Sequence, residues 1–245
     1  MSSKALIRSI TLTKYRFPFE NVGHDLGFAM GPFYEPGSTG SRTVLGIKIE
    51  TAIGISGEYM SIAPGTFEQI QSFGGFLIGK DATHRELFYN QAKTLLRKQD
   101  RMGIGPIDIA LWDLAGKMQN TPIYRMLGGH REKLPAYAST YHADKTKGGL
   151  NSPEAYADFA EQCLELGYKG FKMHGWKEGN PNREESMISA VAERIGSRID
   201  VMYDAACHLK TLTDAIRIGH VCDEHKILWF EDPYADGGLT IRGNK

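Results

Sequence analysis

The chain has 245 residues, of which 41% are hydrophobic and 24% are charged, and its formal net charge is zero. This length is enough to bury one large core or two smaller ones. The balanced charge argues against a nucleic-acid-binding protein, and no apolar stretch is long enough to span a membrane. We therefore expect a soluble globular protein with neither a nucleic-acid nor a membrane partner.

The N-terminal segment and the cysteines indicate the cellular compartment. The segment MSSKALIRSITLTKYRF contains no continuous apolar region of the kind found in secretion signals. Cys163, Cys207 and Cys222 are odd in number and lack the CxxC spacing of zinc sites. Such cysteines are typical of reduced, buried thiols, so we expect a cytoplasmic protein.

In chain order, the first predicted elements are strands at residues 5–17 and 43–60, rich in β-branched residues. Between them lies NVGHDLGFAMGPFYEPGSTGS, residues 21–41, which is dense in glycine and proline. This stretch is too long for a tight hairpin, so it is predicted to be a loop. Its aromatic residues favour a lid that packs onto another part of the protein.

Three helical patterns follow, at residues 66–78, 83–98 and 104–119. The second pattern places Leu87, Ala92, Leu95 and Leu96 on one predicted apolar face. Strands followed by helices indicate an α+β domain, and we place it at residues 1–130.

The remaining residues, 131–245, alternate between short apolar strands and helices. The predicted strands are PAYAST, GFKMH, IDVMYD and KILWFED, and the predicted helices cover residues 152–166, 183–196 and 211–223. Ser152 is the expected cap of the first helix, with Pro153 at its first position. Strict βα order predicts a parallel sheet with right-handed crossovers. Because no glycine-rich phosphate fingerprint follows the first strand, a βα barrel is favoured over a dinucleotide-binding fold.

Charged side chains follow the ends of the predicted barrel strands. Lys172 and His174 share one face of their strand because strand side chains alternate between the two faces. Asp204 ends the third predicted strand and Glu231 lies at the end of the fourth, each about one βα unit further on. Functional sites of βα barrels lie at this edge of the sheet, so we expect the four side chains to face one site.

This combination suits one kind of chemistry in particular. Carboxylates on neighbouring strands can hold a hard cation such as Mg²⁺. The cation and Lys172 could then stabilise the enediolate that forms when a proton next to a carboxylate is removed, with His174 as the base. Each residue also has a structural interpretation, as a loop cap, a surface ion pair or a packing residue. The hypothesis therefore depends on the four residues occurring together.

The segment IGPIDIALWDLAGKMQNTPIYRMLGG, residues 104–129, resembles the signature of the mandelate racemase and muconate lactonizing enzyme group of the enolase superfamily. The resemblance extends over essentially the whole chain. It implies an α/β protein with an N-terminal α+β capping domain, followed here by the first half of a modified (β/α) TIM-type barrel.

The resemblance also implies roles for individual residues. Lys172 matches the first lysine of the family's Lys-x-Lys pair, which is expected to contact the substrate carboxylate. His174 replaces the second lysine, which is often the base in relatives. Asp204 and Glu231 match the first two of three carboxylates that bind Mg²⁺.

The family's capping domain usually shapes the substrate pocket. By position, His24 and Tyr34, together with Tyr59, would close over the site, and His208 could assist departure of a hydroxyl group. His24 can equally be an exposed loop residue, and packing at a helix start is the simpler interpretation of His208. A polar lid and the broken lysine pair favour dehydration of an acid sugar. The alternative is a racemase or epimerase of a 2-hydroxy acid or related carboxylate.

The chain ends shortly after the fourth predicted barrel strand, whereas a full barrel takes roughly 250 residues. The third metal carboxylate and the later-strand residues of the family are therefore absent from it. Two interpretations follow: the front part of a Mg²⁺-dependent enzyme, or a non-catalytic truncated homologue or assembly partner. We favour the enzyme, and expect a small-molecule carboxylate substrate and a homo-oligomer.

Overall fold

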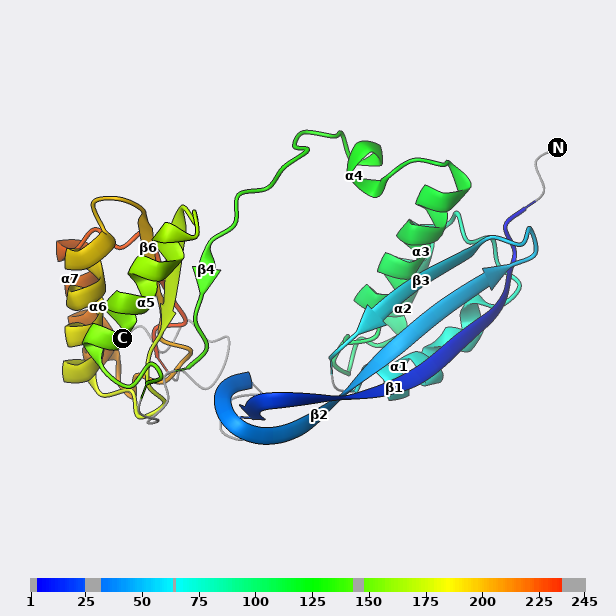
Figure 1. Ribbon diagram of the computed structural model, residues 1–245. Helices are drawn as coiled ribbons and strands as arrows, with labels where there is room; N and C mark the ends of the chain where they lie inside the picture. Colours follow the sequence, from blue (N-terminus) through cyan, green and yellow to red (C-terminus); the bar gives the residue numbers. More distant parts are fainter. Residues whose placement is uncertain (1–3, 25–31, 64, 143–147, 235–245) are drawn as a thin grey trace. The chain divides into compact units, whose positions relative to one another are not determined.

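The computed structural model describes residues 4–24, 32–63, 65–142 and 148–234. The chain divides into two compact units (Figure 1). One comprises Met1–Phe19 with Ser41–Glu132, and the other comprises Glu20–Gly40 with Lys133–Lys245.

An antiparallel sheet has three strands in the order β1-β2-β3, with bounds Ile7–His24, Pro32–Thr51 and Ser56–Ser61. Most of it belongs to the first unit, and the end of β1 and the start of β2 belong to the second. Strand β2 pairs with β3 from Leu45 opposite Ser61 to Glu50 opposite Ser56. Alternate residues of the sheet, among them Ile7, Ile47 and Ile49, are buried in the core of the first unit.

The glycine-rich stretch that was predicted to be a loop is largely strand. Strand β1 continues to His24 and β2 begins at Pro32, so the loop prediction is wrong for residues 21–24 and 32–41. Asn21 and Gly37 both have left-handed backbone angles, and the Asn21 side-chain oxygen accepts the Gly37 N–H at 2.8 Å. This hydrogen bond links β1 to β2 within the stretch that was predicted to be a loop. The rest of the predicted lid, residues 25–31, lies outside the described residues.

Helices of the first unit cover one face of its sheet (Figure 1). They are α1 Thr66–Phe73, continued by a 3-10 turn at Gly74–Leu77, then α2 Arg85–Leu95, α3 Ile104–Met118 and the short α4 Ile123–Met126. In α2 the predicted apolar face is partly wrong. Leu87 and Leu95 are 49% and 55% exposed, whereas Phe88, Ala92 and Leu96 are buried.

Close packing between β3 and α3 depends on Gly57. A Cβ atom at this position would lie 2.0 Å from the carbonyl oxygen of Ala110 and 2.7 Å from Cβ of Leu114. No side chain fits at such distances unless the helix moves. The strand and the helix therefore approach each other because residue 57 has no side chain.

The second unit is the predicted βα region, and its sheet is parallel with the order β4-β5-β6-β7. The strands are β4 Ala138–Ser139, β5 Gly170–His174, β6 Asp200–Asp204 and β7 Phe230–Glu231. The helices between them are α5 Pro153–Glu165, α6 Pro181–Ile195 and α7 Leu212–Glu224, and they lie on one side of the sheet (Figure 1). The predicted fold class, an α+β cap followed by βα barrel units, is confirmed.

Each helix of this unit begins at a side-chain cap. Ser152 accepts the N–H of Ala155, with Pro153 at the first helical position, as predicted from the sequence. Asn180 and Thr211 cap α6 and α7 in the same manner.

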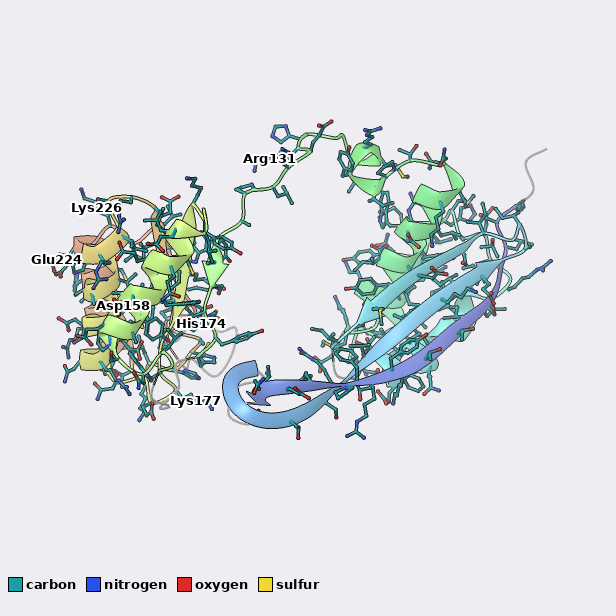
Figure 2. All side chains as sticks on the ribbon, in the orientation of Figure 1. Arg131, Asp158, His174, Lys177, Glu224 and Lys226 are labelled. Atoms are coloured by element: carbon teal, nitrogen blue, oxygen red, sulfur yellow. The ribbon has the colours of Figure 1, made fainter. Side chains whose placement is uncertain are left out.

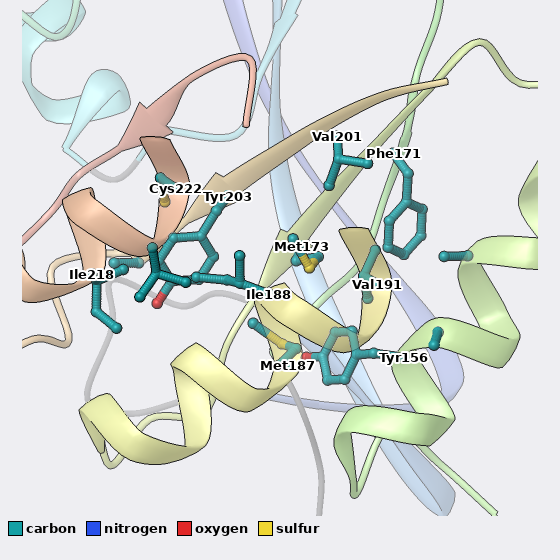
Figure 3. Close-up of a cluster of buried hydrophobic side chains, with 14 of the residues drawn as sticks. Tyr156, Phe171, Met173, Met187, Ile188, Val191, Val201, Tyr203, Ile218 and Cys222 are labelled. Carbon is teal, nitrogen blue, oxygen red and sulfur yellow. The ribbon is translucent and has the colours of Figure 1, made fainter. Parts of the chain in front are cut away.

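The core of the second unit lies between its sheet and its helices. Phe171 and Met173 of β5 are fully buried there, and Figure 3 shows them beside Ile188 and Val191 of α6. Because strand side chains alternate, Lys172 and His174 point to the opposite face of the sheet. The apolar core therefore occupies the helical side and leaves polar groups on the other.

One carboxyl group is buried on the helical side. Glu184, at the start of α6, is 1% exposed and accepts the N–H of Trp176 and the O–H of Tyr203, both at 3.0 Å. A Cβ atom on Gly175 would lie 1.7 Å from this carboxyl, so any side chain there would have to displace it. Burial raises the pKa of Glu184 to about 7, although both hydrogen bonds oppose the shift. The carboxyl thus joins the segment after β5 to β6.

All three cysteines are free, and Cys163 and Cys222 are buried. Within the ranges that the structure describes, none of the helices combines the length and the apolar composition needed to cross a bilayer.

We predict that Gly57→Ala lowers the free energy of unfolding by about 2 kcal/mol or more, because the added methyl group forces α3 away from β3. The matched control is Gly105→Ala in α3, where a Cβ atom meets nothing within 4 Å. That variant should gain up to about 1 kcal/mol of stability from helix propensity. Urea unfolding measures both, and equal stabilities for the two variants would contradict the packing account.

The raised pKa of Glu184 predicts a specific dependence of stability on pH. Between pH 4.5 and about 7 the folded protein keeps a proton on Glu184 that the unfolded chain has released. The contribution of this group to the free energy of unfolding therefore falls as pH rises through this window, by about 3 kcal/mol in total. Glu184→Gln removes that contribution.

Urea unfolding of the wild type and Glu184→Gln from pH 5 to pH 8 measures the effect. The free energy of unfolding of the variant should rise relative to that of the wild type as pH rises. Glu193→Gln, an exposed position on the same helix, serves as the control and should follow the wild type. A constant difference between wild type and Glu184→Gln across this range would show that the carboxyl is already ionised.

Candidate active site

Four predicted site residues lie at the carboxyl edge of the parallel sheet. In the strand register His174 lies opposite Asp204, and Asp204 lies opposite Glu231. Lys172 is two residues before His174 on the same face of β5. In Figure 2, His174 and Lys226 lie toward opposite ends of the second unit, and Lys226 precedes β7. The parallel register thus brings together residues that are far apart in the sequence.

Lys172 links the two carboxylates. Its Nζ atom donates to Oδ2 of Asp204 at 2.9 Å and to Oε2 of Glu231 at 2.8 Å. The side chains of Lys172 and Asp204 are 9% and 7% exposed, whereas that of Glu231 is 41% exposed. One ammonium group therefore offsets two carboxylates, one buried and one open to solvent.

Hydrogen bonds keep Asp204 and Lys172 ionised despite their burial. Burial alone would raise the pKa of Asp204, but hydrogen bonds from His174 and Lys172 outweigh it and hold that pKa well below its usual range. Burial alone would lower the pKa of Lys172, but its hydrogen bonds to Glu231 and Asp204 raise it instead. The site therefore holds an ammonium group beside an ionised Asp204.

His174 is held at both ring nitrogens. Its Nδ1 lies 2.7 Å from the carbonyl oxygen of Thr140, and its Nε2 lies 2.8 Å from Oδ2 of Asp204. A carbonyl oxygen only accepts hydrogen bonds, so Nδ1 carries a hydrogen. An ionised carboxylate oxygen likewise only accepts, so the Nε2 contact also needs a hydrogen, and both ring nitrogens donate in this geometry.

Thr140 and His142 belong to the site, although the sequence analysis did not select them. Thr140 is buried, and its hydroxyl oxygen accepts the main-chain N–H of His174 at 2.9 Å. His142 is buried, with its ring centroid 5.3 Å from that of His174 and 4.9 Å from that of His208. Thr140 ends the predicted strand PAYAST, and this position at the same sheet edge was the available signal.

The turns after β6 and β7 have unusual backbone conformations. Ala206, Cys207 and Asp232 all have positive φ angles, which cost roughly 1–3 kcal/mol each for residues other than glycine. Asp204 Oδ1 accepts the N–H of Ala206 at 2.8 Å, and the Cys207 N–H donates to the carbonyl of Asp232 at 2.9 Å. These contacts hold together the two turns that follow the carboxylate strands.

The predicted substrate-binding residues are only partly placed. The backbone of His24 and Tyr34 lies in β1 and β2, and their side chains lie outside the described residues. Tyr59 is half-buried in β3 and packs against the core of the first unit. His208 contacts the ring of His142. The substrate-binding roles of all four residues remain predictions.

The two carboxylates suit a hard cation. Oδ2 of Asp204 and Oε2 of Glu231 both contact the same ammonium nitrogen, so they already converge on one positive charge. Carboxylate oxygens are the ligands that Mg²⁺ prefers. Within the described ranges, no group of three His, Cys, Asp or Glu side chains is arranged to hold a metal ion. The residues present therefore fit two of the oxygen ligands of such a cation.

Comparison with known families assigns both halves of the chain. Residues 34–128 match the N-terminal domain of the mandelate racemase/muconate lactonizing enzyme family. Residues 155–240 match the enolase C-terminal domain-like family.

Several curated relatives are sugar-acid dehydratases or cycloisomerases, and another is an N-succinyl-L-Arg/Lys racemase. D-galactarolactone cycloisomerase of Agrobacterium fabrum is 33% identical over 185 residues, which cover 72% of this chain and 47% of that protein. Arabinonate dehydratase of Saccharolobus solfataricus is 29% identical over 212 residues, which cover 81% and 54%. This chain therefore spans about half the length of these relatives.

A solved structure agrees with the fold. The crystal structure of D-glucarate dehydratase from Agrobacterium tumefaciens, complexed with magnesium, superposes with a TM-score of 0.84 at 28% identity. The match covers 96% of this chain and 63% of that chain. Since both family models match and the cap and parallel sheet agree, the chain belongs to the mandelate racemase and muconate lactonizing enzyme group of the enolase superfamily.

Proposed function

We propose that the protein is a Mg²⁺-dependent lyase that removes the proton next to the carboxylate of an acid sugar and then eliminates water. One observation carries the proposal: Lys172 and His174 meet Asp204 and Glu231 at the carboxyl edge of the parallel sheet. The sugar-acid dehydratases among its relatives support this substrate class.

Asp204 and Glu231 are the proposed Mg²⁺ ligands in this chain. Their oxygens converge, and Asp204 is ionised because its hydrogen-bond donors outweigh its burial. When bound, Mg²⁺ supplies positive charge that favours the negative charge developing on the substrate carboxylate. Lys172 is proposed to bind that carboxylate, because its ammonium group lies on the same face of the sheet, beside both proposed ligands.

His174 is the proposed base. The Nδ1–H group donates to the Thr140 carbonyl and directs the ring. In the form of the ring that has lost its Nε2 hydrogen, Nε2 is the nitrogen that takes up the substrate proton. The imidazolium that results has its Nε2–H group 2.8 Å from the ionised Asp204, which stabilises the added charge. The hydroxyl of Thr140 holds the main chain of His174 in place.

Proton abstraction and dehydration can be tested together. The intact protein is incubated in D₂O with Mg²⁺ and a panel of acid sugars. NMR follows deuterium at the α-carbon, and a carbonyl reagent detects 2-keto-3-deoxy products. We expect both signals with at least one acid sugar. His174→Ala should lower the exchange rate about 10²–10⁴-fold, the usual contribution of a general base.

The control is His220→Ala, an exposed histidine in α7 that should leave exchange unchanged. Exchange without a keto product would favour the isomerase alternative, which the similarity to a cycloisomerase also supports. Unchanged exchange in His174→Ala would assign the base to another residue. No exchange with any acid sugar would contradict the proposed substrate class.

A further inference from the structure

The oxygens that face one another in the site already carry hydrogen bonds from basic groups. Oδ2 of Asp204 contacts Lys172 Nζ at 2.9 Å and His174 Nε2 at 2.8 Å. Oε2 of Glu231 contacts Lys172 Nζ at 2.8 Å and accepts from Nε1 of Trp229 at 3.2 Å. Lys172 is thus the one residue in these contacts that binds both carboxylates.

A divalent cation at these oxygens would meet the ammonium directly. Mg²⁺ binds carboxylate oxygens at roughly 2.0–2.1 Å, which places it within a few ångströms of any donor on the same oxygen. Lys172 and Asp204 are nearly buried, so water screens the repulsion between the two cations only weakly. The flexible four-carbon stem of lysine allows its ammonium group to move away.

We propose that Lys172 is a built-in competitor for the divalent cation at Asp204 and Glu231, an inference that rests on the proposed function of these carboxylates. Cation binding displaces the ammonium from both oxygens and frees it for the carboxylate of the substrate. Lys172 therefore weakens cation binding and couples it to substrate binding. Two carboxylates without this lysine bind the cation more tightly.

Binding of Mn²⁺ alone, followed by loss of the free-ion EPR signal, tests the proposal without any measurement of catalysis. Lys172→Met should bind Mn²⁺ roughly tenfold or more tightly than the wild type, because it removes the competing charge. The control is Lys169→Met, which removes the same charge from an exposed position next to β5. It should bind Mn²⁺ as the wild type does.

Two further variants control for misfolding of Lys172→Met and test whether the positive charge at residue 172 weakens cation binding. Lys172→Gln keeps a neutral hydrogen-bond donor near the carboxylates, so it should fold even if Lys172→Met does not, and should also bind more tightly. Lys172→Arg keeps the charge and should bind as weakly as the wild type. Circular dichroism checks the fold of each variant.

The outcomes separate this inference from the proposed function. If Asp204→Asn weakens Mn²⁺ binding but neither neutral variant binds more tightly than Lys169→Met, the competition is refuted and the metal site stands. If Asp204→Asn binds Mn²⁺ as the wild type does, the proposed metal site itself is wrong. Absence of binding by every variant overturns both.

Discussion

The polar face of the sheet depends on the hydrogen bonds that the ammonium group of Lys172 donates to two carboxylates. Asp204 is almost buried, and Glu231 is brought beside it by the parallel pairing of β6 and β7. Two carboxylates so close would repel each other and would favour protonation of one. Because Lys172 donates to both, their oxygens converge on one point, and Asp204 stays ionised. The convergence that suits a divalent cation is therefore maintained by a cation of the protein itself.

Support for this arrangement comes from the helical side of the sheet. Glu184 accepts from Trp176, two residues after His174, and from Tyr203, one residue before Asp204. Tyr156 of α5 also donates to the carbonyl of His174. A buried hydrogen-bond network of this kind holds two neighbouring strand ends at one spacing. The groups on the polar face are thus positioned partly by residues on the helical side of the sheet.

The alternation of side chains along β5 places core residues on one face of the strand and polar site residues on the other. Phe171 and Met173 pack into the core with α6, whereas Lys172 and His174 face the carboxylates. Burial of basic groups would be costly without partners, and the register supplies them from the next strand. The strained residues at Ala206, Cys207 and Asp232 lie immediately after these strands, where the chain turns away from the site.

The sequence by itself determined the order of the elements, the faces of β5 and the charged residues at the strand ends, because periodicity and capping depend on near neighbours. Predictions from local composition were wrong where contacts with distant residues determine the structure. Residues 32–41 form strand, and Phe88 replaces Leu87 in the buried face of α2. Only the tertiary structure identified Thr140, His142 and Glu184, which act through partners on other elements. Only it showed that Lys172 binds both carboxylates, since that contact joins three strands and has no signature in any one of them.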